Sequence, residues 1–411
     1  MDTPLLATRP ADLLAYVPYR LGYRPHDSVV ALSLRAPRGA VGLVVRSDLA
    51  DLLSDQGGAA LARAVATHVL RDDPRDVVLV AYGEDEDAAL RGARVLADAL
   101  AEVGPDVPVA ARWHVTSTGY RGLGCDDPGC CPPSGHSLAD LEASPVAAGL
   151  VYAGVGLASS REEAYALAPA EPARRAAALR AARRWARRRD ELGVRAWRRA
   201  SLRAWRDVHA AVAATDPRSL EREVTGQTAA PQRLVAEPPA ARPPAARPSA
   251  RPSAARVAAA CIGRVAAALT DPIVRDAVLL TVLPTGDPGL PDRMLDAAST
   301  GVGLEALEAA ADAVCLLVDP GRGVAPDPDD VRVARAAAEL VAGHARGDGH
   351  AYALGLAAAL AWWAGDGGLA GARADRALEV GPDHGLARLV ADALDRGVGP
   401  GWARADHMSV R

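Results

Sequence analysis

The sequence contains no phenylalanine, and all 47 of its basic residues are arginines because lysine is absent. The missing lysine excludes several mechanisms. A Walker-A phosphate loop, a protein-kinase active site and Schiff-base or pyridoxal-phosphate catalysis each need a lysine amine. None of these is available to this chain. The bias towards arginine and alanine fits a GC-rich coding genome, so the number of arginines does not by itself indicate a function.

Cysteine is scarce as well, with five residues in a chain of 411. An odd number of cysteines in so long a chain argues against a secreted disulfide framework, because such frameworks are dense and usually even in number. The first eleven residues lack a basic region leading into an apolar core, and the longest apolar run, residues 352–364, is too short to span a bilayer. We therefore expect a cytoplasmic protein with no membrane segment.

The overall composition is typical of a globular protein. The chain is 50% apolar and has a formal net charge of -4, which argues against a disordered chain and against a strongly basic nucleic-acid binder. A length of 411 residues is enough for two to three domains.

The first part of the chain begins with a helix and a β-hairpin. A short helix is predicted after Thr8, which can act as its N-cap, and Pro18 and Gly22 are expected to end it. Apolar, β-branched runs at residues 28–34 and 41–48 flank a Pro-Arg-Gly turn, which is the pattern of two antiparallel strands.

Helical and strand-like patterns then alternate. The periodicity predicts a helix at 59–70, a strand at 76–82, a helix at 86–103 and a strand at 107–116. This order predicts an α/β domain with a mixed sheet over residues 1–168.

The rest of the chain is predicted to be mainly α-helical. Residues 169–225 are expected to form Arg/Trp-rich helices. Residues 226–256 repeat Ala, Arg and Pro without apolar periodicity, which is typical of a semi-extended linker. Helical patterns resume after it and predict a helical domain at 257–411.

One segment of that helical domain has the spacing of a tetratricopeptide-type hairpin, in which small residues let two antiparallel helices approach. The residues that define it are Leu354, Ala358, Gly365, Asp366, Ala370, Ala377 and Pro382. Only one unit is convincing, extended by a helix near 386–394. A single hairpin cannot stack into a solenoid, so we favour a role in completing the helical domain over a peptide-binding groove.

Three of the five cysteines and one of the nine histidines lie in the turn-forming loop from Gly124 to His136. Thiolates and imidazole are the standard zinc ligands, so Cys125, Cys130, Cys131 and His136 could together bind one ion. The spacing differs from that of common zinc fingers, because two cysteines are adjacent and all four candidates lie in one loop. Three hypotheses stay open: a zinc site, a reactive or redox-labile thiol pair, and a tight structural turn.

Residues 174–206 contain thirteen arginines interleaved with tryptophans, a composition that could bind a phosphate backbone and stack bases. The alternative is a helix with one core-facing side and its arginines on a solvated side. Its core residues would be Val194, Trp197, Ser201, Trp205, Val208 and Val212. We favour the second interpretation and do not expect nucleic-acid binding.

Two further patterns are weaker candidates. Residues 301–306 match Gly-x-Gly-x-x-Ala, with Asp319 near the position of a ribose-binding acid. The residues before this motif, 292–299, look helical or irregular, whereas a dinucleotide fingerprint requires a strand there. His344, Asp348 and His350 could be ligands, but they fall at a Gly-rich break between helices, where we expect solvent exposure.

Motifs along nearly the whole chain, apart from the linker, support a family resemblance. They include Arg9 to Leu14, Val17-Pro18-Tyr19, Leu21-Gly22-Tyr23 with Pro25 to Ser28, the Cys125, Cys130 to Pro133 and Gly135 loop, Ser144 to Ala148, Ser160 to Glu163, and the Ala-Trp, Gly-Asp-Gly, Ala-Leu, Pro pattern between Ala361 and Pro382. Together they resemble an uncharacterised bacterial family known as domain of unknown function 4192. The resemblance implies no activity, because the family has none assigned. This chain departs from it at Gly119-Tyr120-Arg121, where the family has a tryptophan-rich lead into the cysteines.

No catalytic constellation accompanies these motifs, since the sequence lacks a Gly-x-Ser-x-Gly elbow and a His-Glu-x-x-His pair. We therefore expect a non-enzymatic intracellular binding or scaffold protein whose helical domain binds a protein partner. The alternative is a metal-dependent or thiol-based enzyme centred on Cys125, Cys130, Cys131 and His136, with zinc as the candidate cofactor.

Overall fold

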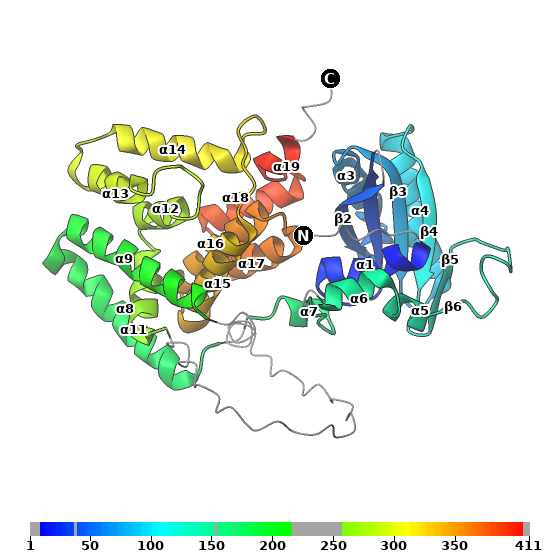
Figure 1. Ribbon diagram of the computed structural model, residues 1–411, viewed down its shortest axis with the longest axis horizontal. Coiled ribbons are helices and arrows are strands. Elements are labelled where there is room, and N and C mark those ends of the chain that lie inside the picture. The colour runs from blue at the N-terminus through cyan, green and yellow to red at the C-terminus, as the bar shows by residue number, and fades with distance from the viewer. Residues whose placement is uncertain (1–8, 37–38, 153–154, 168, 216–256, 406–411) are drawn as a thin grey trace, which may run out of the picture. The chain divides into compact units, whose positions relative to one another are not determined.

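The computed structural model describes residues 9–36, 39–152, 155–167, 169–215 and 257–405. The chain divides into two compact units, Met1–Tyr165 and Ala166–Arg411. The first is an α/β unit and the second is helical (Figure 1), which confirms the predicted fold class. Thr8 and the predicted linker at 226–256 lie outside the described residues.

The α/β unit is built around one mixed sheet with the strand order β2-β1-β3-β4-β5-β6. Strands β3 and β4 are parallel and are joined by helix α4, whereas the other neighbouring strands are antiparallel. Its elements are α1 (Pro10–Leu21), β1 (Ser28–Arg35), β2 (Ala40–Asp48), α2 (Leu49–Leu52), α3 (Gly58–Leu70), β3 (Pro74–Tyr82), α4 (Glu86–Val103), β4 (Val109–Val115), β5 (Gly119–Gly122), β6 (His136–Ser137), α5 (Leu138–Glu142), α6 (Pro145–Tyr152) and α7 (Arg161–Ala164).

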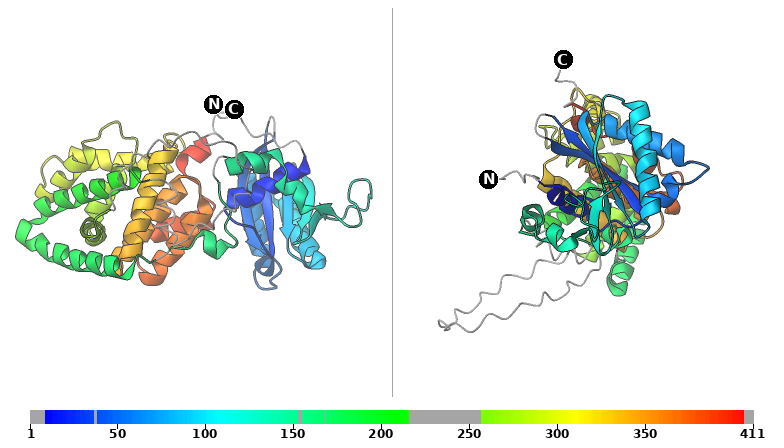
Figure 2. Two further views of the ribbon diagram at one scale, coloured as in Figure 1. Left: turned by 60° about the horizontal axis from the view of Figure 1, so that its bottom comes forward. Right: turned by 90° about the vertical axis from the view of Figure 1, so that its right-hand side faces the viewer.

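Helices cover both faces of this sheet (Figure 2), so its central strands are apolar on both sides. Val29 and Ala31 of β1 face the core that includes α3 and α4. Val30 and Leu32 face the opposite core, which includes α1. The continuous apolar runs in β1 and β3 follow from this two-sided burial.

Helix α1 ends at one of the two residues that were predicted to end it. Pro18 was expected to help end it, but the helix continues to Leu21 and ends at Gly22, whose φ of 82° is left-handed. Proline lacks an N–H and so removes one hydrogen bond of the helix without stopping it. The positive φ at Gly22 is what terminates it, because residues with a Cβ are disfavoured there.

The helical unit contains α8 (Pro172–Leu192), α9 (Val194–Ala213), α11 (Ala259–Ala268), α12 (Pro272–Leu280), α13 (Leu290–Thr300), α14 (Glu305–Val318), α15 (Pro328–His344), α16 (Asp348–Trp363), α17 (Gly367–Val380), α18 (Gly385–Asp395) and α19 (Gly401–Ala405). Helices α8 and α9 pack against α11. None of the helices in the described ranges is long and apolar enough to cross a membrane.

Tryptophans join α8 to α9. Trp185 donates a hydrogen bond from Nε1 to Ser201 Oγ at 2.9 Å, and Trp197 donates from Nε1 to the Trp185 carbonyl at 2.9 Å. The predicted core side of α9 is buried apart from Val194, which is exposed. The indoles are therefore used in packing, as expected for a helix with one buried side.

The predicted hairpin is formed by α16 and α17, which pack against each other. Ala370, Ala374 and Ala377 of α17 are fully buried, so small side chains allow the close approach that the sequence pattern indicated. Helix α18 packs against α17 and extends the hairpin.

Candidate functional site

The cysteine loop connects β5 to β6 and projects beyond the sheet edge of the α/β unit (Figure 1). The loop does not follow the strand predicted at 107–116 directly, because a further strand that the sequence did not predict lies between them. After β4 the chain turns back and forms β5 antiparallel to it. Strand β5 begins and ends with glycine, a residue with low strand propensity, so no local pattern indicated it.

Backbone hydrogen bonds fold the loop back on itself. The Cys125 N–H donates to the Gly122 carbonyl at 3.3 Å, and the N–H groups of Cys130 and Cys131 donate to the Asp127 carbonyl at 3.1 and 2.7 Å. Gly124 supplies the turn with a φ of +70°, a conformation that glycine adopts without strain.

This folding brings three thiols together. The Sγ atoms of Cys125, Cys130 and Cys131 all lie within 4.8 Å of one another, and all three thiols are free. Cys131 is buried, Cys125 is half-buried and Cys130 is exposed. With Zn–S bonds of about 2.3 Å, tetrahedral geometry places sulfurs about 3.8 Å apart. Small side-chain adjustments would thus suffice to hold one zinc ion.

Gly122 shapes the inner side of this group. Its N–H donates to Cys131 Sγ at 3.2 Å. A Cβ at this position would lie 3.1 Å from Cys125 Cβ and 3.2 Å from Cys131 Sγ, which is tighter than most side chains pack. The absence of a side chain therefore lets the backbone approach both cysteines.

The three thiols differ in acidity. Hydrogen bonds from the Asp127 N–H and from the Cys131 thiol lower the pKa of Cys125. Hydrogen bonds with Cys125 and Cys131, together with their negative charges, raise the pKa of Cys130 to about 11. Three thiolates at this spacing repel one another, and a bound cation would relieve that repulsion.

His136 lies outside the group of sulfurs. It is the first residue of β6, its Nε2 is 2.8 Å from the Cys130 carbonyl oxygen, and its ring stacks on Tyr120 with centroids 4.9 Å apart. The structure thus brings together three of the four candidate ligands. The imidazole sits at the base of the loop, where it holds the returning strand.

The two candidate histidines of the helical unit, His344 and His350, lie within hydrogen-bonding distance of backbone carbonyl oxygens. His344 was expected to be exposed, but it is only 2% exposed, and its Nδ1 is 2.8 Å from the Leu340 carbonyl oxygen. The last turn of α15 is buried because α16 packs against α15. His350 Nδ1 is 2.8 Å from the Ala342 carbonyl oxygen, and Asp348 is exposed. Among the described residues these three groups do not form a ligand cluster.

The Gly-x-Gly-x-x-Ala segment connects two helices. It follows α13, for which Gly301 is the left-handed C-cap, and it leads into α14. Asp319 is the C-cap residue of α14. The helix before the motif confirms that its context is not that of a dinucleotide-binding strand.

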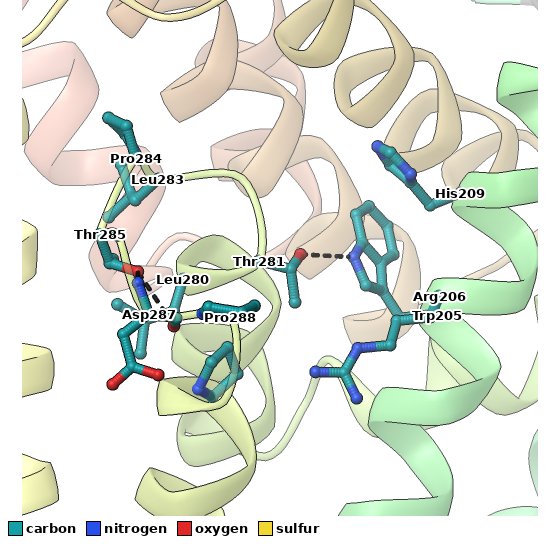
Figure 3. Close-up of a pocket in the computed structure, with 12 residues that line it drawn as sticks. Trp205, Arg206, His209, Leu280, Thr281, Leu283, Pro284, Thr285, Asp287 and Pro288 are labelled. Atoms are coloured by element: carbon teal, nitrogen blue, oxygen red, sulfur yellow. Dashed lines mark hydrogen bonds between the residues drawn. The ribbon is translucent and has the colours of Figure 1, made fainter.

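A pocket of about 500 Å³ in the helical unit was not predicted. It lies between α9 and the segment from α12 to α13, with Trp205, His209 and Thr281 among its lining residues (Figure 3). Trp205 Nε1 donates to Thr281 Oγ1 at 3.0 Å, and the neighbouring Arg206 pairs with Asp292 at 2.7 Å. Trp205, Thr281 and Arg206 are therefore already engaged with partners in the protein.

Comparison with known proteins gives one match. The family model described as a domain of unknown function, DUF4192, matches residues 10–317 and again residues 291–401. No curated protein and no solved structure matches the chain. The family matches therefore cover both compact units, including the cysteine loop, and the chain belongs to the DUF4192 family.

Proposed function

We propose that this chain is a non-enzymatic zinc-binding protein. Cys125, Cys130 and Cys131 hold one zinc ion that stabilises the loop between β5 and β6, and the helical unit binds a protein partner. The observation that carries the metal-binding part is the convergence of the three sulfurs within 4.8 Å in one exposed loop.

The chemistry of the donors favours zinc. Thiolates are soft ligands that select zinc, copper(I) or iron–sulfur clusters, and zinc accepts tetrahedral geometry without redox chemistry. Backbone N–H groups already point at two of the sulfurs, as outer-shell donors do in thiolate metal sites. Asp127, a carboxylate within the loop, accepts a hydrogen bond from the Gly129 N–H at 2.8 Å and so stabilises the turn.

The decisive experiment is the metal content of protein purified without a histidine tag under reducing conditions. We expect about one equivalent of zinc by mass spectrometry in the wild type and none in the Cys125/Cys130/Cys131→Ser variant. A matched control, Cys261→Ser/Cys315→Ser, removes the two cysteines outside the loop and should keep the metal. A metal-free wild type would overturn the proposal and leave thiol chemistry or a structural turn.

The partner-binding part is supported by the exposed side of α14. Leu304, just before the helix, is 55% exposed, and Val314 and Val318 within it are 37% and 48% exposed. Glu305 and Glu308 lie in the first turn of the same helix. An apolar stripe next to acidic groups fits a basic amphipathic helix of a partner protein.

A partner identified with the wild-type protein separates the binding function from the enzymatic alternative. We expect the Cys125/Cys130/Cys131→Ser variant to retain that partner and a Val314→Glu/Val318→Glu variant to lose it. Loss of the partner only in the cysteine variant would instead favour a function centred on the cysteine loop.

A further inference from the structure

The outer side of α8 carries a row of exposed arginines, Arg180, Arg183, Arg184 and Arg187, together termed the arginine ridge. Apart from the adjacent Arg183 and Arg184, they are three, four or seven residues apart, so all four lie on one side of the helix. With a rise of 1.5 Å per residue, the ridge is about 10 Å long. It is therefore a compact strip of positive charge.

The neighbouring arginines form ion pairs within the helical unit. Arg189 and Arg198 both pair with Asp271 at 3.1 Å, and Arg195 and Arg199 both pair with Asp296. Arg188, beside the ridge, lies 3.7 Å from Glu191. Within the described residues, the four arginines of the ridge have no hydrogen bond or ion pair. Their charge is not needed to hold α8 in place.

Concentrating these charges has a cost for the helix, because like charges three or four residues apart destabilise it. The overall composition does not explain this concentration of unpaired arginines, because the chain has 51 acidic residues that could pair with its 47 basic ones. A strip of unneutralised guanidinium groups is the arrangement that attracts a polyanion.

The side chains around the ridge indicate which polyanion fits. The residues between the arginines include Ala182 and Ala186 and no large exposed apolar group, so the ridge lacks the apolar centre that a protein interface needs. Trp185 is 5% exposed, and Arg264 lies over its ring at 5.0 Å. No indole in the ridge is therefore available to stack unpaired bases.

These observations favour a duplex over a single strand and over a protein. The major groove of B-form DNA admits an α-helix, which brings arginines on the exposed side of the helix close to the phosphates along the groove. The deep, narrow major groove of an RNA duplex does not admit a helix. We propose that the arginine ridge binds the phosphate backbone of double-stranded DNA without base specificity. This inference goes beyond the proposed function and does not depend on the metal site.

The proposal departs from the expectation that nucleic acid is not bound. Thirteen arginines between 174 and 206 look alike in the sequence. The structure separates those that pair with acids or carbonyls from five that are exposed and unpaired within the described residues, namely the four of the ridge on α8 and Arg203 on α9.

Fluorescence anisotropy of the full-length protein with a mixed-sequence 20-base-pair DNA duplex tests the proposal. If four phosphates are neutralised, the affinity should fall on the order of 100-fold between 50 and 200 mM salt. The variant Arg180/Arg183/Arg184/Arg187→Gln should bind at least about tenfold more weakly at the lower salt. Glutamine preserves helix propensity, and circular dichroism verifies that the variant is folded.

The matched control removes four exposed arginines of the α/β unit, Arg63, Arg91, Arg94 and Arg112, and so has the same loss of charge. It should bind like the wild type. An equal loss of affinity in the control would overturn the proposal, because binding would then depend on the net charge of the protein and not on the arginine ridge. So would the absence of DNA binding at 50 mM salt, or tighter binding of an RNA duplex or polyglutamate than of DNA.

Discussion

Asp72 connects the turn after α3 to both strands of the β1–β2 hairpin. Its carboxylate accepts hydrogen bonds from Arg35 Nε at 3.0 Å, from the Leu43 N–H at 2.8 Å and from the Ser33 hydroxyl. Burial alone would raise the pKa of Asp72, but these hydrogen bonds outweigh burial and lower the pKa below its ordinary value. A charged carboxylate at this position therefore stabilises the folded hairpin.

We predict that Asp72→Asn lowers the free energy of unfolding by about 1.5–3 kcal/mol at pH 7, because charge-assisted hydrogen bonds are lost. Urea unfolding measures the change. The folded-state pKa is lowered, so the stabilisation is present above the ordinary value of 3.8 and is lost as the pH falls below it. The difference between wild type and variant should shrink below that value. A difference that stays constant into strong acid would contradict this role.

Gly122 is predicted to matter for metal binding without being a ligand. In Gly122→Ala, the new Cβ would press on Cys125 and Cys131 and displace the sulfurs, so we expect zinc affinity to fall by about tenfold or more. Competition with a chelator gives the affinity. Gly57→Ala is a suitable control, because a Cβ at Gly57 has no atom within 4 Å. Unchanged affinity in Gly122→Ala would show that the loop adapts without cost.

At the scale of elements, Asp271 holds three helices together. It caps α12 by accepting hydrogen bonds from the N–H groups of Ile273 at 3.0 Å and Val274 at 3.3 Å. It also pairs with Arg189 of α8 and Arg198 of α9, and it is only 3% exposed. One carboxylate thus serves both as a helix cap and as the partner of a buried charge.

Asp271→Ala should destabilise the helical unit by about 3–5 kcal/mol, because it leaves the buried Arg198 charge uncompensated. Asp271→Asn should cost less, since its side-chain oxygen can still cap α12. Guanidinium unfolding compares the two. Asp276→Ala removes an exposed partner of Arg275 and should change stability by about 1 kcal/mol or less. Equal losses in all three variants would refute a special role for Asp271.

At the scale of the whole molecule, the cysteine loop and its contacts lie within the first compact unit, Met1–Tyr165. We therefore predict that a fragment of residues 1–165 folds and binds about one equivalent of zinc, as the full chain does. Cooperative thermal unfolding and metal analysis of the fragment check this. A folded fragment without metal would mean that the second unit contributes to the site.

The order of helices and strands was predictable because apolar periodicity is a local property of the chain. The apolar runs at 28–34 and 76–82 and the spacing of Trp197, Ser201 and Trp205 indicated their elements before any contact was known. The short strands β5 and β6 were not predictable, since two to four residues with glycine at key positions carry no periodic signal.

The sequence by itself determined the fold class and the exclusion of lysine-dependent chemistry. Tertiary structure alone decided that three sulfurs converge while His136 lies apart, that His344 is buried, and that four arginines of α8 remain unpaired within the described residues. The physical reason is that periodicity depends on neighbours in the chain. Convergence, burial and charge pairing depend on distances between residues that only folding brings together.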